Sequence, residues 1–182
     1  GLISYNYGTY GGGIIVQNNG KIIMNGGDIK GNKADHNGAG IALFASTTVI
    51  SGGIIEENVN TGTWIGIGGG ISTDKGADLT IIGGTIRNNY ANRGAGIGAW
   101  TGGDIRIYGG KITGNISTED TTPTDCTENN YGAGIYFDTA DTGYSAVTSN
   151  LTLGKSAYII GNTNSVTDLE ENVYFAKGQT IT

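Results

Sequence analysis

Several residue types that shape common protein classes are scarce in this chain of 182 residues. There is one cysteine, Cys126, which excludes an intrachain disulfide framework and a zinc site built on several cysteines. There is one proline and no Gly-X-Y period, which excludes collagen. Six residues are Leu whereas 25 are Ile, and a helical protein would not favour the β-branched residue in that ratio. These absences favour a β protein.

Charge and long apolar runs are also limited. Charged residues make up 14% of the chain, and the net charge is −6 with ten scattered Lys and Arg residues. Such an acidic surface makes nucleic acid or an anionic membrane an unsuitable partner. No stretch reaches the length of apolar sequence that crosses a bilayer, so no membrane insertion is expected.

Glycine, by contrast, is abundant, with 35 residues, and much of it is periodic. Two short patterns alternate along the chain. The pattern Gly-Gly/Ala-Gly-Ile occurs five times, at Gly11–Ile14, Gly38–Ile41, Gly68–Ile71, Gly94–Ile97 and Gly132–Ile135. The pattern Gly-Gly-x-Ile-x-x-Asn occurs four times, at Gly26–Asn32, Gly52–Asn58, Gly83–Asn89 and Gly109–Asn115, and its tail recurs at Ile3–Asn6 and Ile159–Asn162.

The spacing of the asparagines that close this second pattern gives the length of the repeat. They are Asn6, Asn32, Asn58, Asn89, Asn115 and Asn162, separated by 26, 26, 31, 26 and 47 residues. Insertions of five, twelve and nine residues account for the two long intervals, so the unit has 26 residues. Because these asparagines share one corner, they are expected to form an internal amide ladder that satisfies turn backbone groups.

Each unit is interpreted as three short strands. The first follows Gly-x-Gly-Ile, and the third carries the Ile of Gly-Gly-x-Ile-x-x-Asn. The second strands alternate apolar and polar residues and are expected at Lys21–Asn25, Thr47–Ser51, Asp78–Ile82, Asp104–Tyr108 and Asn150–Leu153. The prediction is an all-β, right-handed parallel β-helix of about six rungs, with columns of Ile, including Ile86 and Ile112, inside. An up-and-down barrel has no reason for a fixed 26-residue unit.

Residues 1–182 are taken as a single β-helix domain. The first ten residues begin inside a third strand, and Gln179–Thr182 resemble the start of another second strand. With no capping helix over either end of the coil, we expect this domain to be a fragment of a longer repetitive protein whose flanking repeats cover its edge strands.

The Gly-Gly/Ala-Gly-Ile and Ile-x-x-Asn repeats resemble the right-handed β-helix repeats of large surface proteins from gram-positive gut bacteria. They are more distantly similar to the repeats of chlamydial polymorphic outer-membrane proteins, in which Phe stands where this chain has Ile. The closing segment Asn172–Ile181 is also similar to the gut proteins. The resemblance covers nearly the whole chain and implies an extracellular, cell-surface adhesin, stalk or glycan-binding module.

Two outward columns are expected on the first strands. One holds Ile15, Ala42, Ser72, Gly98 and Tyr136, and the other holds Gln17, Phe44, Asp74, Trp100 and Asp138. Exposed aromatic rings beside carboxylates can bind a sugar, because the ring face stacks on CH groups and the acids accept hydroxyl protons. The predicted ligand-binding residues are Phe44, Trp64, Asp74, Trp100, Tyr136 and Asp138. In the alternative interpretation, these aromatics only pad the insertion loops.

Catalysis and metal binding have weaker candidates. Asp74 and Asp138 are two rungs apart, about 9.6 Å at the usual strand spacing, near the separation found in inverting glycosidases. Two solvated surface acids are the simpler interpretation. Lys30, Glu56 and Arg87 share a third-strand column and are interpreted as a charge ladder between rungs.

The insertions fall at corners and span Val59–Ile67, Ile116–Tyr131 and roughly Asp138–Asn150. The second has oxygen ligands for a possible Ca²⁺ in Glu119, Asp120, Asp125 and Glu128, but no EF-hand spacing, and a polar surface loop is the simpler interpretation. No other cofactor is expected. His36, the single histidine, lacks a Ser or Cys partner for a catalytic triad.

Three functions remain open. The first is a non-catalytic module that binds a glycan or glycoprotein at the bacterial cell surface. The second is a structural stalk segment. The third is a carbohydrate-active enzyme, a glycoside hydrolase or polysaccharide lyase, that uses Asp74 and Asp138. Fold alone does not separate them.

Overall fold

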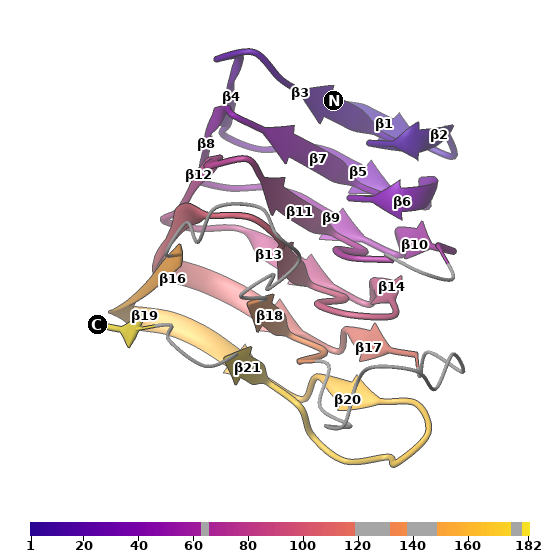
Figure 1. Cartoon of the computed structure of the whole chain (residues 1–182), viewed down its shortest axis with the longest axis vertical. Helices are drawn as coiled ribbons and strands as arrows, with labels where there is room; N and C mark the ends of the chain where they lie inside the picture. Colours follow the sequence, from indigo (N-terminus) through magenta and orange to yellow (C-terminus); the bar gives the residue numbers. More distant parts are fainter. Residues whose placement is uncertain (63–65, 119–131, 138–148, 176–179) are drawn as a thin grey trace.

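A computed structural model describes residues 1–62, 66–118, 132–137, 149–175 and 180–182. The described residues form strands and turns and contain no helix. The strands of successive turns pair in parallel and stack into a β-solenoid, in agreement with the parallel β-helix predicted from the repeat (Figure 1).

The turns up to residue 91 contain four strands each, rather than the predicted three, and in the next two turns the second and third strands are continuous. The faces are named here after the order of strands in the repeat unit. The first-strand face is β3 (Ile14–Val16), β7 (Ile41–Phe44), β11 (Ile71–Asp74), β15 (Ile97–Ala99), β18 (Ile135–Phe137) and β21 (Val173–Phe175). The second-strand face is β4 (Lys21–Met24), β8 (Thr47–Ile50), β12 (Asp78–Ile81), the first parts of β16 (Gly103–Thr113) and β19 (Ser149–Ile160), and β22 (Thr180–Ile181).

The third-strand face is β1 (Leu2–Ser4), β5 (Asp28–Lys30), β9 (Ile54–Glu56), β13 (Thr85–Arg87) and the second parts of β16 and β19. Because β16 and β19 run through the corner, the second-strand and third-strand faces join into one sheet. The fourth-strand face is β2 (Tyr7–Tyr10), β6 (Lys33–Asn37), β10 (Val59–Asn60), β14 (Tyr90–Ala91), β17 (Ile116–Ser117) and β20 (Thr163–Asn164).

The fourth-strand face was missed because it gives no hydrophobic signal. Its buried residues are small or polar, at Ala34, Asn37, Asn60, Ala91, Ser117 and Asn164. A period of two is recognised in a sequence by apolar alternation, and these short segments do not alternate apolar with polar residues.

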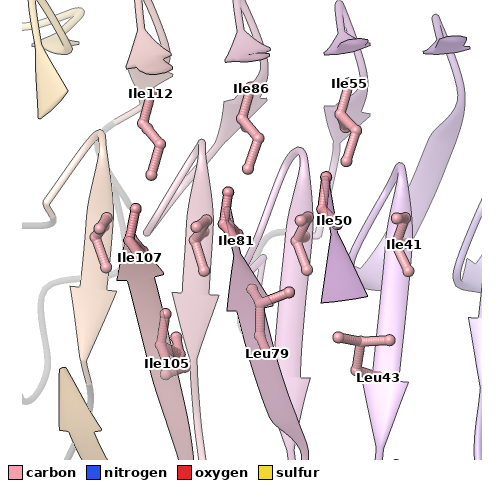
Figure 2. Packing of buried hydrophobic residues seen from close by; sticks show 14 of the residues in the cluster. Ile41, Leu43, Ile50, Ile55, Leu79, Ile81, Ile86, Ile105, Ile107 and Ile112 are labelled. Atoms are coloured by element: carbon pink, nitrogen blue, oxygen red, sulfur yellow. The ribbon is translucent and has the colours of Figure 1, made fainter. Parts of the chain in front are cut away.

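Inside the solenoid, the predicted columns of Ile form the core. Figure 2 shows Ile55, Ile86 and Ile112 following one another from rung to rung, opposite Ile50, Ile81 and Ile107. Ile86 and Ile112 are each 2% exposed. Burial of such a side chain stabilises the fold by roughly 1.5–3 kcal/mol, so the columns supply much of the driving force for winding.

The predicted amide ladder is present at the corner between the third-strand and fourth-strand faces. The Nδ2 of each Asn donates to the Oδ1 of the Asn one rung further on, from Asn6 through Asn32, Asn58, Asn89 and Asn115 to Asn162, over 2.8–3.0 Å. Asn162 in turn donates to Asn172, which extends the ladder beyond the predicted residues. The same Oδ1 atoms accept backbone N–H groups, so the corner is fully hydrogen-bonded.

The two repeat motifs meet at this ladder. A Cβ placed on Gly40 would lie 3.1 Å from Asn58 Nδ2 and 2.5 Å from the carbonyl oxygen of Gly70. Gly70 and Gly96 face Asn89 and Asn115 in the same way. The second glycine of Gly-x-Gly-Ile is therefore required first by the backbone carbonyl of the next rung, and the asparagine of the other motif crowds the same position.

Candidate functional site

The candidate site lies on the outer side of the first-strand face. Ile41 and Leu43 of β7 point into the core, so Ala42 and Phe44 point outward, as predicted. The register aligns Ala42 with Ser72 and Phe44 with Asp74 on the next rung.

The first of the two outward columns is covered, contrary to the expectation that it faces solvent. Ala42 is fully buried, Ser72 is 1% exposed and Tyr136 is 7% exposed. The chain that turns into this face lies over the column: a Cβ on Gly98 would lie 2.1 Å from Cγ2 of Ile67 and 2.7 Å from the backbone nitrogen of Gly68. Ile15, on the first rung, is an exposed member of the column.

Tyr136 therefore does not stand in solvent as expected. Its ring stacks on that of Tyr174, with centroids 5.2 Å apart and planes 9° from parallel. The guanidinium of Arg93 lies 5.8 Å from the Tyr136 centroid. These contacts give Tyr136 a packing role between two rungs.

The second outward column retains the predicted aromatic residues. Phe44 and Trp100 are partly exposed, and Asp74 lies between them. The backbone N–H of Trp100 donates to the carbonyl of Thr73 over 3.0 Å, which fixes Trp100 beside Asp74 on the adjoining rung. Two partly exposed rings thus stand two rungs apart, on the order of 10 Å along the coil.

Asp74 is less available than the sequence suggested. It is 8% exposed, and its Oδ1 accepts hydrogen bonds from the backbone N–H of Lys75 and from the hydroxyl of Thr101. This carboxylate therefore holds the turn after β11, which weakens its candidacy as a catalytic acid or base.

Around Phe44 the structure gathers three residues that sequence reasoning missed. The Tyr10 ring meets Phe44 edge to face at 5.6 Å and lies 4.7 Å from the His36 ring. The ammonium of Lys75 lies 5.8 Å from the Phe44 centroid. Tyr10 and His36 both stand just before a glycine corner, outside the strands considered at first, so only the fold brings them to Phe44.

Several predicted site residues lie outside the described residues. They are Trp64, Asp138, Glu119, Asp120, Asp125 and Glu128, together with Cys126. The Asp74–Asp138 pair and the possible Ca²⁺ site therefore stay predictions. Over the part of the chain that the structure describes, no three His, Cys, Asp or Glu side chains gather closely enough to hold a metal ion.

The predicted charge ladder on the third-strand face is confirmed. Glu56 accepts from Lys30 Nζ at 2.9 Å and from the Arg87 guanidinium at 2.8 Å, and Lys30 also reaches Glu57 at 3.0 Å. The hydrogen bond from Lys30 lowers the pKa of Glu56, and Arg87 adds to the effect against the opposing effect of burial. Glu57 was not anticipated, because it follows the end of β9.

Comparisons with known protein families, with curated proteins and with solved structures give no match. Within the described residues, no helix has the length and apolar character needed to span a membrane.

Proposed function

We propose that this chain is a non-catalytic module that binds glycans or mediates adhesion outside the cell, as part of a bacterial cell-surface protein. The observation that carries the proposal is the pair of partly exposed rings, Phe44 and Trp100, in one outward column. Aromatic faces on a rigid sheet bind the CH face of a sugar at little entropic cost. The resemblance of the repeats to those of gut surface proteins supports the extracellular location.

The surroundings of these rings suit a saccharide. Tyr10 packs against Phe44 and against His36, and the Lys75 ammonium adds a hydrogen-bond donor at the same surface. Neighbouring polar groups of this kind fix the orientation of a ring that stacks on an aromatic platform.

A glycan array, followed by titration with mucin oligosaccharides, tests the proposal. We expect the unmodified protein to bind and Trp100→Ala to lose about tenfold or more in affinity, since such ring contacts contribute about 1 kcal/mol beyond the area they bury. Tyr90→Ala, on the fourth-strand face, is the matched aromatic control and should bind normally. Equal binding by Trp100→Ala and the unmodified chain would rule this surface out.

A structural stalk is the second candidate, and the Asn ladder favours it. The ladder runs without a break through the stacked rungs from Asn6 to Asn172 and gives the coil a continuous, buried hydrogen-bonded spine. A stalk predicts that no glycan binds and that Trp100→Ala lowers the melting temperature. Binding with unchanged melting in that variant would argue for the module and against the stalk.

A carbohydrate-active enzyme has less support, because Asp74 already holds its own turn. Reducing ends or unsaturated products released from a polysaccharide panel, and lost in Asp74→Asn, would revive it.

A further inference from the structure

On the third-strand face, one corner departs from the repeat in both sequence and strand pairing. Four corners between the second-strand and third-strand faces carry paired glycines, at 26–27, 52–53, 83–84 and 109–110. In β19 the corresponding residues are Ser156 and Ala157, and the pairing of β19 with β16 shifts register between Ile107 and Gly109. Bulges of this kind are enriched beside binding sites because they redirect side chains.

An open pocket of about 390 Å³ lies at this irregularity. Gly110 and Lys111 of β16 and Ser156 and Tyr158 of β19 line it. Lys111 and Tyr158 are directly paired across the two strands, so both side chains leave the sheet on the same outer side. Tyr158 is 53% exposed, which leaves its ring available for stacking.

Among the residues that the structure describes, Lys111 has no ion-pair partner, unlike the neighbouring cations on this face. Lys30 and Arg87 are both paired with Glu56. On the two rungs before Lys111, its column holds Ile54 and Thr85, which carry no charge, and the acidic residue of the column, Asp28, is three rungs away. None of the described ion pairs includes Lys111 or the exposed Lys155, which lies next to Ser156. In a chain of net charge −6, Lys111 at the pocket, with Lys155 next in sequence to the lining residue Ser156, marks a local preference for anions.

We propose that this pocket binds an anionic sugar residue, with its ring on Tyr158 and its carboxylate or sulfate at Lys111. The Ser156 hydroxyl is placed to exchange hydrogen bonds with the sugar. A doubly charged phosphate fits less well, because such groups are usually held by several Arg or Lys side chains, and among the described lining residues Lys111 is the one cation. The site is separate from Phe44 and Trp100 and does not depend on them.

Isothermal titration calorimetry with three tetrasaccharides tests the proposal. Hyaluronan tetrasaccharide offers carboxylates, chondroitin sulfate tetrasaccharide offers carboxylates and sulfates, and maltotetraose is neutral. We expect at least one anionic tetrasaccharide to bind better than maltotetraose, and its binding to weaken as salt is raised. Comparing the affinities of the two anionic tetrasaccharides shows whether Lys111 pairs with a carboxylate or with a sulfate.

Two variants locate the binding. Lys111→Gln should weaken the anionic ligand about threefold to fivefold, since one exposed charge pair contributes that much. Tyr158→Ser should weaken it about tenfold through loss of the ring. Lys21→Gln, an exposed lysine on the second-strand face without a tyrosine paired beside it, is the matched control and should bind as the unmodified chain does.

Three results would overturn the proposal: no anionic binding, equal binding of maltotetraose, or unchanged affinity in both Lys111→Gln and Tyr158→Ser. Trp100→Ala should keep this binding, so failure of the first-strand site and failure of this one are distinguishable. Circular dichroism of each variant confirms that loss of binding is not loss of fold.

Discussion

Single glycines in this coil are required by close contact as well as by backbone conformation. The second glycine of each corner pair has a positive φ, between 88° and 96° at Gly27, Gly53, Gly84 and Gly110, a conformation that favours glycine. Gly98 is different, because its constraint is the approach of Ile67 and Gly68 across the outer side of the first-strand face. The repeat marks the corner glycines, whereas Gly98 lies outside both motifs, and only the packed structure shows why it is required.

Gly98→Ala tests the contact. The new Cβ would lie within 2.7 Å of a backbone nitrogen, so the strand must shift, and we expect a loss of about 1–3 kcal/mol in unfolding free energy. Gly26→Ala is the control: a Cβ there meets nothing within 4 Å, and its stability should change by less than about 0.5 kcal/mol. Urea denaturation of both variants measures the difference, and equal stabilities would refute the proposed crowding.

Substitution of Asn89 tests how much one side chain of the ladder contributes to stability. Its Oδ1 accepts from Asn58 N and Nδ2, and its Nδ2 donates to the carbonyl of Ile55 and to Asn115. Asn89→Ala removes all four hydrogen bonds, although Asn58 Nδ2 keeps its bond to Ile29 O and Asn115 Oδ1 keeps the backbone N–H of residue 89. The buried Asn58 N–H loses its acceptor, and we expect a total loss of at least about 3 kcal/mol.

The matched control for Asn89→Ala is Asn6→Ala. Asn6 is exposed at the first rung and contacts the ladder only as a donor to Asn32. Its removal should cost about 1 kcal/mol or less. Similar losses in the two variants, measured by chemical denaturation, would mean that the interior of the ladder adds little to stability.

Among the strands, those with apolar alternation were predicted well and those without it were not. The five expected second strands correspond to β4, β8, β12 and the first parts of β16 and β19. β22 also continues the second-strand face, as Gln179–Thr182 suggested. The fourth-strand face escaped prediction because its inward positions are Ala, Ser and Asn, which carry no apolar period.

The candidate site was predicted only in part, for a physical reason. Alternation within a strand gave the correct outward direction of Phe44 and Asp74. Whether an outward position reaches solvent depends on which other segments pack over it. In this column Ala42 and Ser72 are buried, and the turn at Ile67–Gly68 lies over Gly98. No local pattern contains that information.

The Lys30–Glu56–Arg87 ladder ties three strands together and makes their stability depend on pH. The pKa of Glu56 lies below its ordinary value of 4.5 in the folded chain, first because Lys30 donates to it. A carboxyl whose pKa falls on folding stabilises the fold above its unfolded pKa, and this contribution is lost as pH falls through the folded pKa.

Glu56→Gln measures this contribution. Lys30 and Arg87 are partly solvated, so we expect the variant to lose about 1 kcal/mol at pH 7 and the difference from the unmodified chain to shrink below pH 4. Unfolding free energies at pH 7, 5 and 3 give the comparison. A difference that stays constant over this range would show that the ionised carboxylate is not responsible.

At the scale of the molecule, the interior apolar columns stabilise the whole coil. Each rung contacts only its neighbours, so its stability depends on the column residues of the adjacent rungs. Ile86 lies in the middle of such a column and is 2% exposed (Figure 2). Ile86→Asp buries an unpaired charge, so we expect the variant to lose about 4 kcal/mol or more and to be largely unfolded at 25 °C.

Ile23→Asp is the matched control for Ile86→Asp. Ile23 is 59% exposed on the outer side of β4, so the new carboxylate stays in water and the fold should persist. Thermal unfolding followed by circular dichroism compares the two. A folded Ile86→Asp with unchanged melting would mean that the inward column is wrongly assigned.

In the whole molecule, the residues that build the repeat differ from the residues proposed to bind a ligand. Glycine, isoleucine and asparagine recur at fixed places and build the coil, whereas Phe44, Trp100, Lys111 and Tyr158 stand where the repeat permits variation. Proteins that use a rigid scaffold commonly place binding residues at such variable outer positions.

Nuclear magnetic resonance of the two tryptophan indoles during titration with mucin oligosaccharides tests the proposed binding surface most directly. Trp100→Phe assigns the two Nε1–H signals, because Trp64 is the only other tryptophan. We expect the Trp100 signal to shift with saturating dependence on oligosaccharide concentration. A Trp100 signal that stays unchanged while glycan binding is demonstrated elsewhere, or while no glycan binds at all, would contradict a sugar site on this face.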